Sequence, residues 1–259
     1  MSYLLNLETY IINFIKEMGK IVVFFFTACF WMFKPPFFIR ETIENMRKVG
    51  YQCLLPVLAV VGPTGMVTAL QSMYIFDIFG AHRLLSSLLA EGMFRELAPT
   101  LASIMIAAQA GSAIAGEIGT MRVKEEIDAL EVMSVNPFQY LIVPRFLALA
   151  IMCPLINIIA SLTGILGGYA VAVVLKGLNH GIFMANLFEF LKLSHILGGM
   201  LKASVFGLIV GLLSCYKGYH VTGGALGVGR AANTTVVHSI LAIVCLNYFL
   251  TSFLIAIID

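Results

Sequence analysis

Charged residues are scarce in this sequence of 259 residues: Asp, Glu, Lys and Arg together make up 12% of it, against about 25% of an average soluble domain. Hydrophobic residues make up 60%, and a soluble domain of this length has no interior large enough to bury them all. The net charge is only +2, so the composition gives no indication of a nucleic-acid partner. These proportions predict a protein that lies in a lipid bilayer.

Several catalytic motifs are also missing. There is no G-x-x-x-x-G-K-[ST] loop to cradle the phosphates of ATP, and no G-x-S-x-G nucleophile motif. The five cysteines lie singly and the five histidines are far apart, so neither shows the spacing of a metal site. The glycine-rich stretch 224–229 has the wrong order for a dinucleotide fingerprint, and we expect a flexible cytoplasmic loop there. We therefore expect no catalytic residue, no metal and no cofactor in this chain.

Long apolar stretches are what the sequence does contain. A helix that crosses a bilayer needs about 20 predominantly apolar residues. Five stretches qualify, at residues 52–80, 88–116, 143–175, 196–216 and 236–258, and His238 opens the last of them. Glycines recur within these stretches, as is common where membrane helices pack closely. The expected fold class is all-α: a polytopic membrane protein with about five transmembrane helices.

The N-terminal region differs from these spans. Residues 21–33 are strongly apolar but too few to cross a bilayer, and Lys16, Lys20 and Lys34 flank them. With Trp31 they suit the headgroup level, so we expect an interfacial helix. A signal sequence is the alternative, because residues 26–29 loosely imitate a lipobox. We expect two parts: a cytoplasmic and interfacial helical segment over residues 1–50, and a transmembrane domain over residues 51–259.

Lysine and arginine favour the cytoplasmic side of membrane proteins, and their distribution predicts the orientation. With the N-terminus inside, the outer segments hold only Arg83, Lys176 and Lys192. The inner segments hold the larger group: Lys16, Lys20, Lys34, Arg40, Arg47, Lys48, Arg122, Lys124, Arg145, Lys217 and Arg230. The predicted topology therefore has a cytoplasmic N-terminus and, after five spans, a C-terminus on the outer side.

The loop between the second and third spans carries the densest charge cluster in the chain. Its apolar residues recur at steps of four and three, which predicts one apolar stripe on a short cytoplasmic helix; they are Val123, Ile127, Leu130 and Met133. Thr120 would cap the start of this helix and Asn136-Pro137 would end it. Its acidic residues outnumber Arg122 and Lys124; they are Glu117, Glu125, Glu126, Asp128 and Glu131. Because the inner leaflet is anionic, a protein partner is favoured over the lipid headgroups.

Three charged residues fall within predicted spans. Arg95 and Glu96 lie at the start of the second span, and Lys202 lies about a third of the way into the fourth. An ionisable group at such a depth is costly unless it is paired or hydrated, so these residues are candidates for function. Under the predicted topology all three lie in the outer half of the membrane, where they could meet and bind an anionic headgroup. The alternative is that Arg95 and Lys202 extend to the outer surface.

The same residues carry a resemblance to a known family. The stretches 95–99 (RELAP), 111–121 (GSAIAGEIGTM) and 126–133 (EIDALEVM) resemble the signature region of MlaE-type permeases, the membrane subunits of lipid ABC transporters. The resemblance extends over residues 50–259 and includes 64–71, 136–137, 143–145, 222–230 and 235–239. Gln109 departs from the pattern, since a basic residue is expected there.

This resemblance implies a function. Such permeases are homodimers in the bacterial inner membrane, and each subunit seats one member of a cytoplasmic ATPase dimer through a coupling helix. The resemblance places that helix at 120–135 and the ATP and Mg²⁺ in the partner ATPase. It also implies a phospholipid substrate, a cavity near Arg95, Glu96 and Lys202, and a periplasmic ring of MCE-domain subunits.

Two other classes of function remain as alternatives. A stand-alone secondary transporter or flippase would usually show an internal repeat and coupling-ion groups near the midplane, and we find no such repeat. An intramembrane lipid enzyme would need catalytic motifs that the sequence lacks.

Overall fold

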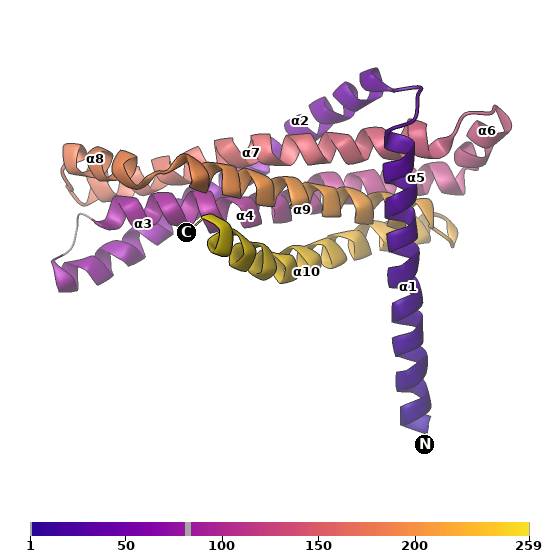
Figure 1. Cartoon of the computed structure of the whole chain (residues 1–259), viewed down its shortest axis with the longest axis horizontal. Coiled ribbons are helices and arrows are strands. Elements are labelled where there is room, and N and C mark those ends of the chain that lie inside the picture. The colour runs from indigo at the N-terminus through magenta and orange to yellow at the C-terminus, as the bar shows by residue number, and fades with distance from the viewer. Residues whose placement is uncertain (1, 81–83, 259) are drawn as a thin grey trace.

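A computed structural model of the chain describes residues 2–80 and 84–258, and the predicted outer Arg83 therefore lies outside the described residues, as does His82. The described part is helical throughout its length apart from short connections (Figure 1). Five helical stretches are long and apolar enough to cross a membrane: Ile39–Phe79, Leu84–Val123, Phe138–Leu175, Leu193–Tyr219 and Gly224–Ala256. The prediction of an all-α multi-pass membrane protein with five spans is confirmed.

Three of these stretches are continuous helices, namely α2 (Ile39–Phe79), α9 (Leu193–Tyr219) and α10 (Gly224–Ile258). The second stretch consists of α3 (Leu84–Gly92), η1 (Met93–Leu97), α4 (Ala98–Ile106), η2 (Ala107–Gly111) and α5 (Ser112–Val123), where η marks a π-helical segment. The third consists of η3 (Phe138–Ile142), α7 (Val143–Tyr169) and η4 (Ala170–Leu175).

The predicted boundaries of the first and last spans are wrong, because both helices begin 12 or 13 residues earlier. Helix α2 starts at Ile39, and its first turns carry charged residues that the hydropathy pattern excludes. Helix α10 starts at Gly224, so the glycine-rich stretch 224–229 forms helical turns rather than a flexible loop. The chain reverses direction just before, where Gly223 has a φ of 90° and Gly224 a φ of 66°, conformations that favour glycine. His238 consequently lies inside α10 and does not open it.

Glycines set the closeness of the helix packing. A Cβ added to Gly65 of α2 would lie 1.9 Å from the carbonyl oxygen of Gly164 in α7, and one added to Gly167 would lie 2.4 Å from the carbonyl oxygen of Gly62. Similarly, a Cβ on Gly207 of α9 would lie 2.6 Å from the carbonyl oxygen of Leu149. These contacts confirm that the glycines serve close packing between the spans.

Three helices outside the spans complete the described part of the fold. Helix α8 (His180–Phe190), which we did not predict, lies between the third and fourth spans, and the Asn179 side chain caps it by accepting from the backbone N–H of Gly181 and Ile182. Helix α1 (Ser2–Met32) runs across the bundle near the end that carries α6 (Glu126–Val132), as Figure 1 shows. A large angle to the spans is the geometry expected of an interfacial helix, so the interfacial position of α1 stays a prediction. The helix is longer than the apolar stretch 21–33.

Candidate functional site

Lys202 lies at the centre of a buried polar cluster. Its side chain is 0% exposed, although it projects from α9 within a membrane span. The ammonium donates to Glu96 Oε1 at 2.7 Å, to Thr251 Oγ1 at 2.7 Å and to the carbonyl oxygen of Arg95 at 3.0 Å. All three ammonium protons therefore have acceptors, as a buried lysine requires. The alternative that Lys202 extends to the outer surface is wrong.

A proline explains why the carbonyl of Arg95 is available. Pro99 follows it by four residues and has no N–H, so the helical hydrogen bond that this carbonyl would otherwise accept cannot form. The same turn is π-helical in η1, a form that is frequent at functional sites. Gly199 lets α9 approach η1 closely, because a Cβ added to this glycine would lie 2.1 Å from the Phe94 carbonyl oxygen. The sequence Arg95-Glu96-Leu97-Ala98-Pro99 thus supplies both an anion and a backbone acceptor for Lys202.

The last span contributes two residues that our sequence reasoning missed. Asn247 Nδ2 donates to Glu96 Oε2 at 3.3 Å, and the Thr251 hydroxyl lies 3.1 Å from Glu96 Oε1. Both residues belong to α10 and stand four positions apart in an otherwise apolar stretch, which places them on one helix face. That spacing was the signal available in the sequence. Glu96 is 34% exposed and is the part of the cluster open to its surroundings.

Arg95 points to a different partner. Its Nη1 donates to Glu91 Oε1 at 3.0 Å, one turn earlier in the second span, and its side chain is 14% exposed. The structure therefore brings Glu96 and Lys202 into direct contact, as we expected, whereas the Arg95 side chain is paired with a carboxylate that we had not considered. Arg95 contributes its backbone carbonyl to the cluster, where it accepts a hydrogen bond from Lys202.

The predicted helix over 120–135 is two helices. Helix α5 continues to Val123, and α6 begins at Glu126 after a sharp turn in which Glu125 has a φ of 60°. Thr120 does not cap a helix start, because it lies inside α5 and its hydroxyl donates to the carbonyl of Gly116 at 2.8 Å. The turn separates Val123 from the rest of the predicted stripe.

The apolar residues of this region also face different surroundings. Ile127 is completely buried and Leu130 packs against the core of the same chain. Val132 is 86% exposed, Met133 64% and Val123 42%. The prediction of a single apolar face that receives a partner is therefore wrong for Ile127 and Leu130, which hold α6 onto the bundle, and the exposed apolar surface consists of Val123, Val132 and Met133.

Ion pairs fix the shape of the α5–α6 region. Asp128 accepts from Arg122, and Lys124 Nζ lies 3.9 Å from Glu126 Oε1. Lower on α5, Glu117 Oε2 accepts from Arg145 Nη2 at 3.2 Å.

Arg145 is almost fully buried and also donates to the carbonyl of Leu141 at 3.0 Å. The Glu117–Arg145 pair therefore ties the end of the second span to the beginning of the third.

The arrangement provides no metal centre among the described residues. Residues 2–80 and 84–258 contain no group of three His, Cys, Asp or Glu side chains that could hold a metal ion. What the geometry provides is a buried ion pair that joins three spans near one end of the bundle and a helix with exposed apolar residues at the other.

Comparisons with known proteins point to one family. The family described as Permease MlaE matches residues 42–253. The chain is 35% identical over 243 residues to a probable ABC transporter permease protein of Rickettsia typhi, with 94% of each chain covered. It is 35% identical over 256 residues to the intermembrane phospholipid transport system permease protein MlaE of Haemophilus influenzae, with 93% of this chain and 97% of the relative covered. It is also 33% identical over 214 residues to the chloroplastic protein TRIGALACTOSYLDIACYLGLYCEROL 1 of Arabidopsis thaliana, with 83% of this chain and 61% of the relative covered.

Proposed function

The chain belongs to the MlaE permease family, and from this membership we propose that it is the membrane-spanning subunit of an ABC transporter that moves phospholipid. The names of two relatives, a probable ABC transporter permease and an intermembrane phospholipid transport permease, support this proposal. The observation that carries it is α6: a short helix at the end of the bundle, held from within by Ile127 and exposing Val132 and Met133. Such a surface suits a protein partner on the cytoplasmic side.

The partner that fits α6 is a separate ATPase, because this sequence has no phosphate-binding loop of its own. In the proposed complex, two copies of this chain seat an ATPase dimer, which holds ATP and Mg²⁺ and performs the hydrolysis. A periplasmic MCE-domain ring receives or supplies the lipid on the other side. This assembly places the chain in the bacterial inner membrane, with residues 1–50 at the cytoplasmic face, residues 51–259 as the permease domain and the C-terminus in the periplasm.

The contacts of the chain suggest how ATPase movement reaches the lipid. A displacement of α6 acts on α5, and the Glu117–Arg145 pair passes it to the third span as well. Helix α5 continues through α4 into η1, where Glu96 contacts Lys202 of α9 and Asn247 of α10. Movement of the second span therefore changes the relative positions of the second, fourth and fifth spans at the Glu96–Lys202 cluster.

The exposure of the cluster distinguishes the roles of its members. Lys202 is fully buried and holds the spans together, whereas Glu96 and Arg95 are partly exposed and can meet a lipid headgroup. We assign Lys202 a structural role in this conformation, with headgroup binding confined to rearranged states in which the ion pair opens.

Co-purification of the ATPase with tagged permease tests the role of α6. Val132→Asp together with Met133→Asp should abolish recovery of the ATPase and leave the thermal stability of the permease unchanged, because both side chains are mostly exposed. Leu193→Asp is the matched control: Leu193 is 69% exposed and lies at the opposite end, at the start of α9, where a carboxylate is favourable.

Ile127→Asp should instead lower the stability of the permease itself, since Ile127 is buried within the chain. Full recovery of the ATPase with the Val132 and Met133 variant would contradict the assignment of α6 as the coupling helix.

A further inference from the structure

A groove lies where α1 crosses the ends of the third and fourth spans. It has a volume of about 570 Å³, and α1 lines one side of it with Lys16, Gly19, Lys20 and Val23. The other side includes Phe138 of η3 and His220, which follows α9. The groove is distant from the Glu96–Lys202 cluster, because α1 lies near the end of the bundle that carries α6 (Figure 1).

Aromatic contacts fix α1 in this position. Phe24 is buried and its ring centre lies 5.2 Å from that of Phe138, 5.6 Å from that of Tyr216 and 6.0 Å from that of His220. Two residues after the end of α1, the carbonyl of Lys34 accepts a hydrogen bond from the Gln139 side chain at 2.8 Å. The groove is therefore a built feature of the fold and its two walls are held together.

The groove is positively charged. Lys16 and Lys20 line it and are exposed. The neighbouring carboxylate, Glu17, accepts a hydrogen bond from Lys217 of α9, so an additional cation already neutralises it. The lysines thus leave an excess of positive charge at the groove, beside the imidazole of His220.

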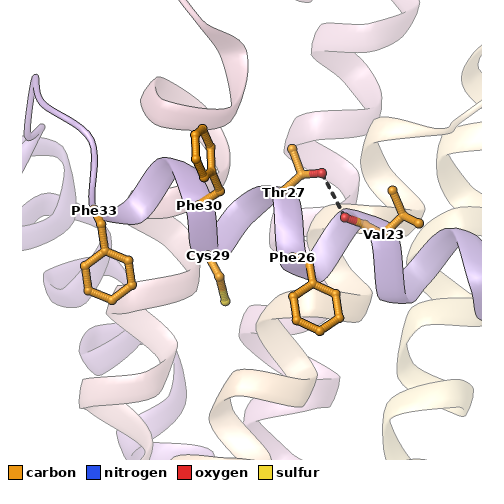
Figure 2. Close-up of a pocket in the computed structure, with 6 residues that line it drawn as sticks. All are labelled: Val23, Phe26, Thr27, Cys29, Phe30 and Phe33. Carbon is orange, nitrogen blue, oxygen red and sulfur yellow. Dashed lines mark hydrogen bonds between the residues drawn. The ribbon is translucent and has the colours of Figure 1, made fainter.

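An apolar hollow continues from this groove along α1. It has a volume of about 650 Å³, and Val23 and Thr27 line both spaces. Figure 2 shows that Phe26, Cys29 and Phe33 project to one side of the helix, and that the Thr27 hydroxyl is turned to the carbonyl of Val23, to which it donates at 2.8 Å. The polar group of Thr27 is therefore satisfied within α1, and the hollow presents an apolar surface.

A cationic groove that passes into an apolar hollow is complementary to an amphiphile with an anionic head. We propose that this site binds an anionic phospholipid of the leaflet in which α1 lies, with its phosphate at Lys16 and Lys20 and its acyl chains along Val23, Phe26 and Phe33. The site is separate from the proposed transport path and does not depend on the proposed function. By holding a lipid there, the protein fixes α1 at the membrane surface.

Native mass spectrometry of the full-length chain in detergent, titrated with phosphatidylglycerol, tests the site. Each surface lysine contributes about fivefold to the affinity for anionic lipid, so Lys16→Gln with Lys20→Gln should weaken binding roughly 25-fold. The matched control is Arg47→Gln with Lys48→Gln, which removes the same charge from an exposed part of α2 outside the groove, and we expect less than a threefold change.

A second variant fills the groove without changing its charge. A Cβ added to Gly19 would meet no atom within 4 Å, so Gly19→Leu projects a side chain into open space and should not disturb the fold. We expect it to weaken phosphatidylglycerol binding at least fivefold and to leave the thermal stability unchanged.

Three results would overturn the proposal. The first is that the Lys16 and Lys20 variant and the Arg47 and Lys48 variant weaken phosphatidylglycerol binding equally, which would mean that only the general surface charge matters. The second is displacement of the bound lipid by millimolar inorganic phosphate, or equal binding of phosphatidylcholine, since either would remove the requirement for an anionic lipid. The third is unchanged lipid binding in the Lys16 and Lys20 variant combined with loss of the ATPase, which would make the groove a protein contact.

Discussion

Removing the charge of Glu96 should destabilise the protein more than removing the charge of Lys202. Glu96→Gln keeps an oxygen acceptor near the ammonium but leaves a positive charge that is 0% exposed without its counter-ion. Breaking a buried ion pair from one side costs about 3–5 kcal/mol, and the partial exposure of Glu96 reduces this to about 2–3 kcal/mol.

The reverse change leaves a better-solvated ion. Lys202→Met leaves the Glu96 carboxylate, which is 34% exposed and can still accept from Asn247 and Thr251. We expect a cost of about 1–2 kcal/mol. The double variant Glu96→Gln with Lys202→Met contains no unpaired charge in the cluster and should cost about 1 kcal/mol or less. The coupling energy between the two positions is then about 2–4 kcal/mol.

Steric trapping of the chain in bicelles measures these free energies of unfolding under reversible conditions. Thr163→Ala on α7 is a control, since its hydroxyl only donates back to the Ile159 carbonyl and takes no part in the cluster. Additive costs for Glu96→Gln and Lys202→Met would refute the reasoning, as would a larger loss of stability from the lysine change than from the glutamate change.

The structure gives three further predictions. Gly65→Ala should lower the free energy of unfolding by about 1–3 kcal/mol because α7 leaves no room for the methyl group, whereas Gly92→Ala, which faces open space, should not lower it; thermal unfolding in detergent compares them. Arg145→Met should cost about 1.5–3 kcal/mol by removing charge-assisted hydrogen bonds, and an unchanged melting temperature would count against the buried pair. The hydrogen bond from Lys217 lowers the pKa of Glu17 below its ordinary value. The contact therefore stabilises the position of α1 at pH values above the pKa of Glu17 in the unfolded chain, and this stabilisation is lost as the pH falls through the lower pKa of the folded state. The protection of the α1 amides against hydrogen exchange, measured relative to their intrinsic exchange rate at each pH, should therefore fall in acid for the wild type but not for Glu17→Gln, and identical protection profiles would contradict this.

The number of spans was predictable because length and hydropathy are local properties of the chain. The sequence could not show where the helices end, since helical turns outside the hydrocarbon region need no apolar residues. The early start of α10 illustrates this, because Gly224–Gly229 reads as a loop by composition yet forms helical turns. Helix α8 was missed for a related reason: its eleven residues are too few for a span, and only the Asn179 cap marks its start.

The candidate cluster was predictable in part. Charges within apolar spans must find partners, so Glu96 and Lys202 could be brought together from the topology alone. The sequence also shows that Pro99 has no N–H to donate to the Arg95 carbonyl. That Lys202 donates to this carbonyl instead depends on how α9 packs against η1, which the sequence does not show. The prediction for the α5–α6 region was wrong because an apolar periodicity assumes one continuous helix. The positive φ of Glu125 ends that continuity and gives α6 a direction different from that of α5.

The most direct test of the proposed function is phospholipid movement in proteoliposomes. The chain, reconstituted with its ATPase partner, should move fluorescent phospholipid to an external acceptor only when ATP and Mg²⁺ are supplied, and the chain alone should move none under a proton or sodium gradient. Transfer by the chain alone under an ion gradient, or the appearance of chemically altered lipid, would contradict the account.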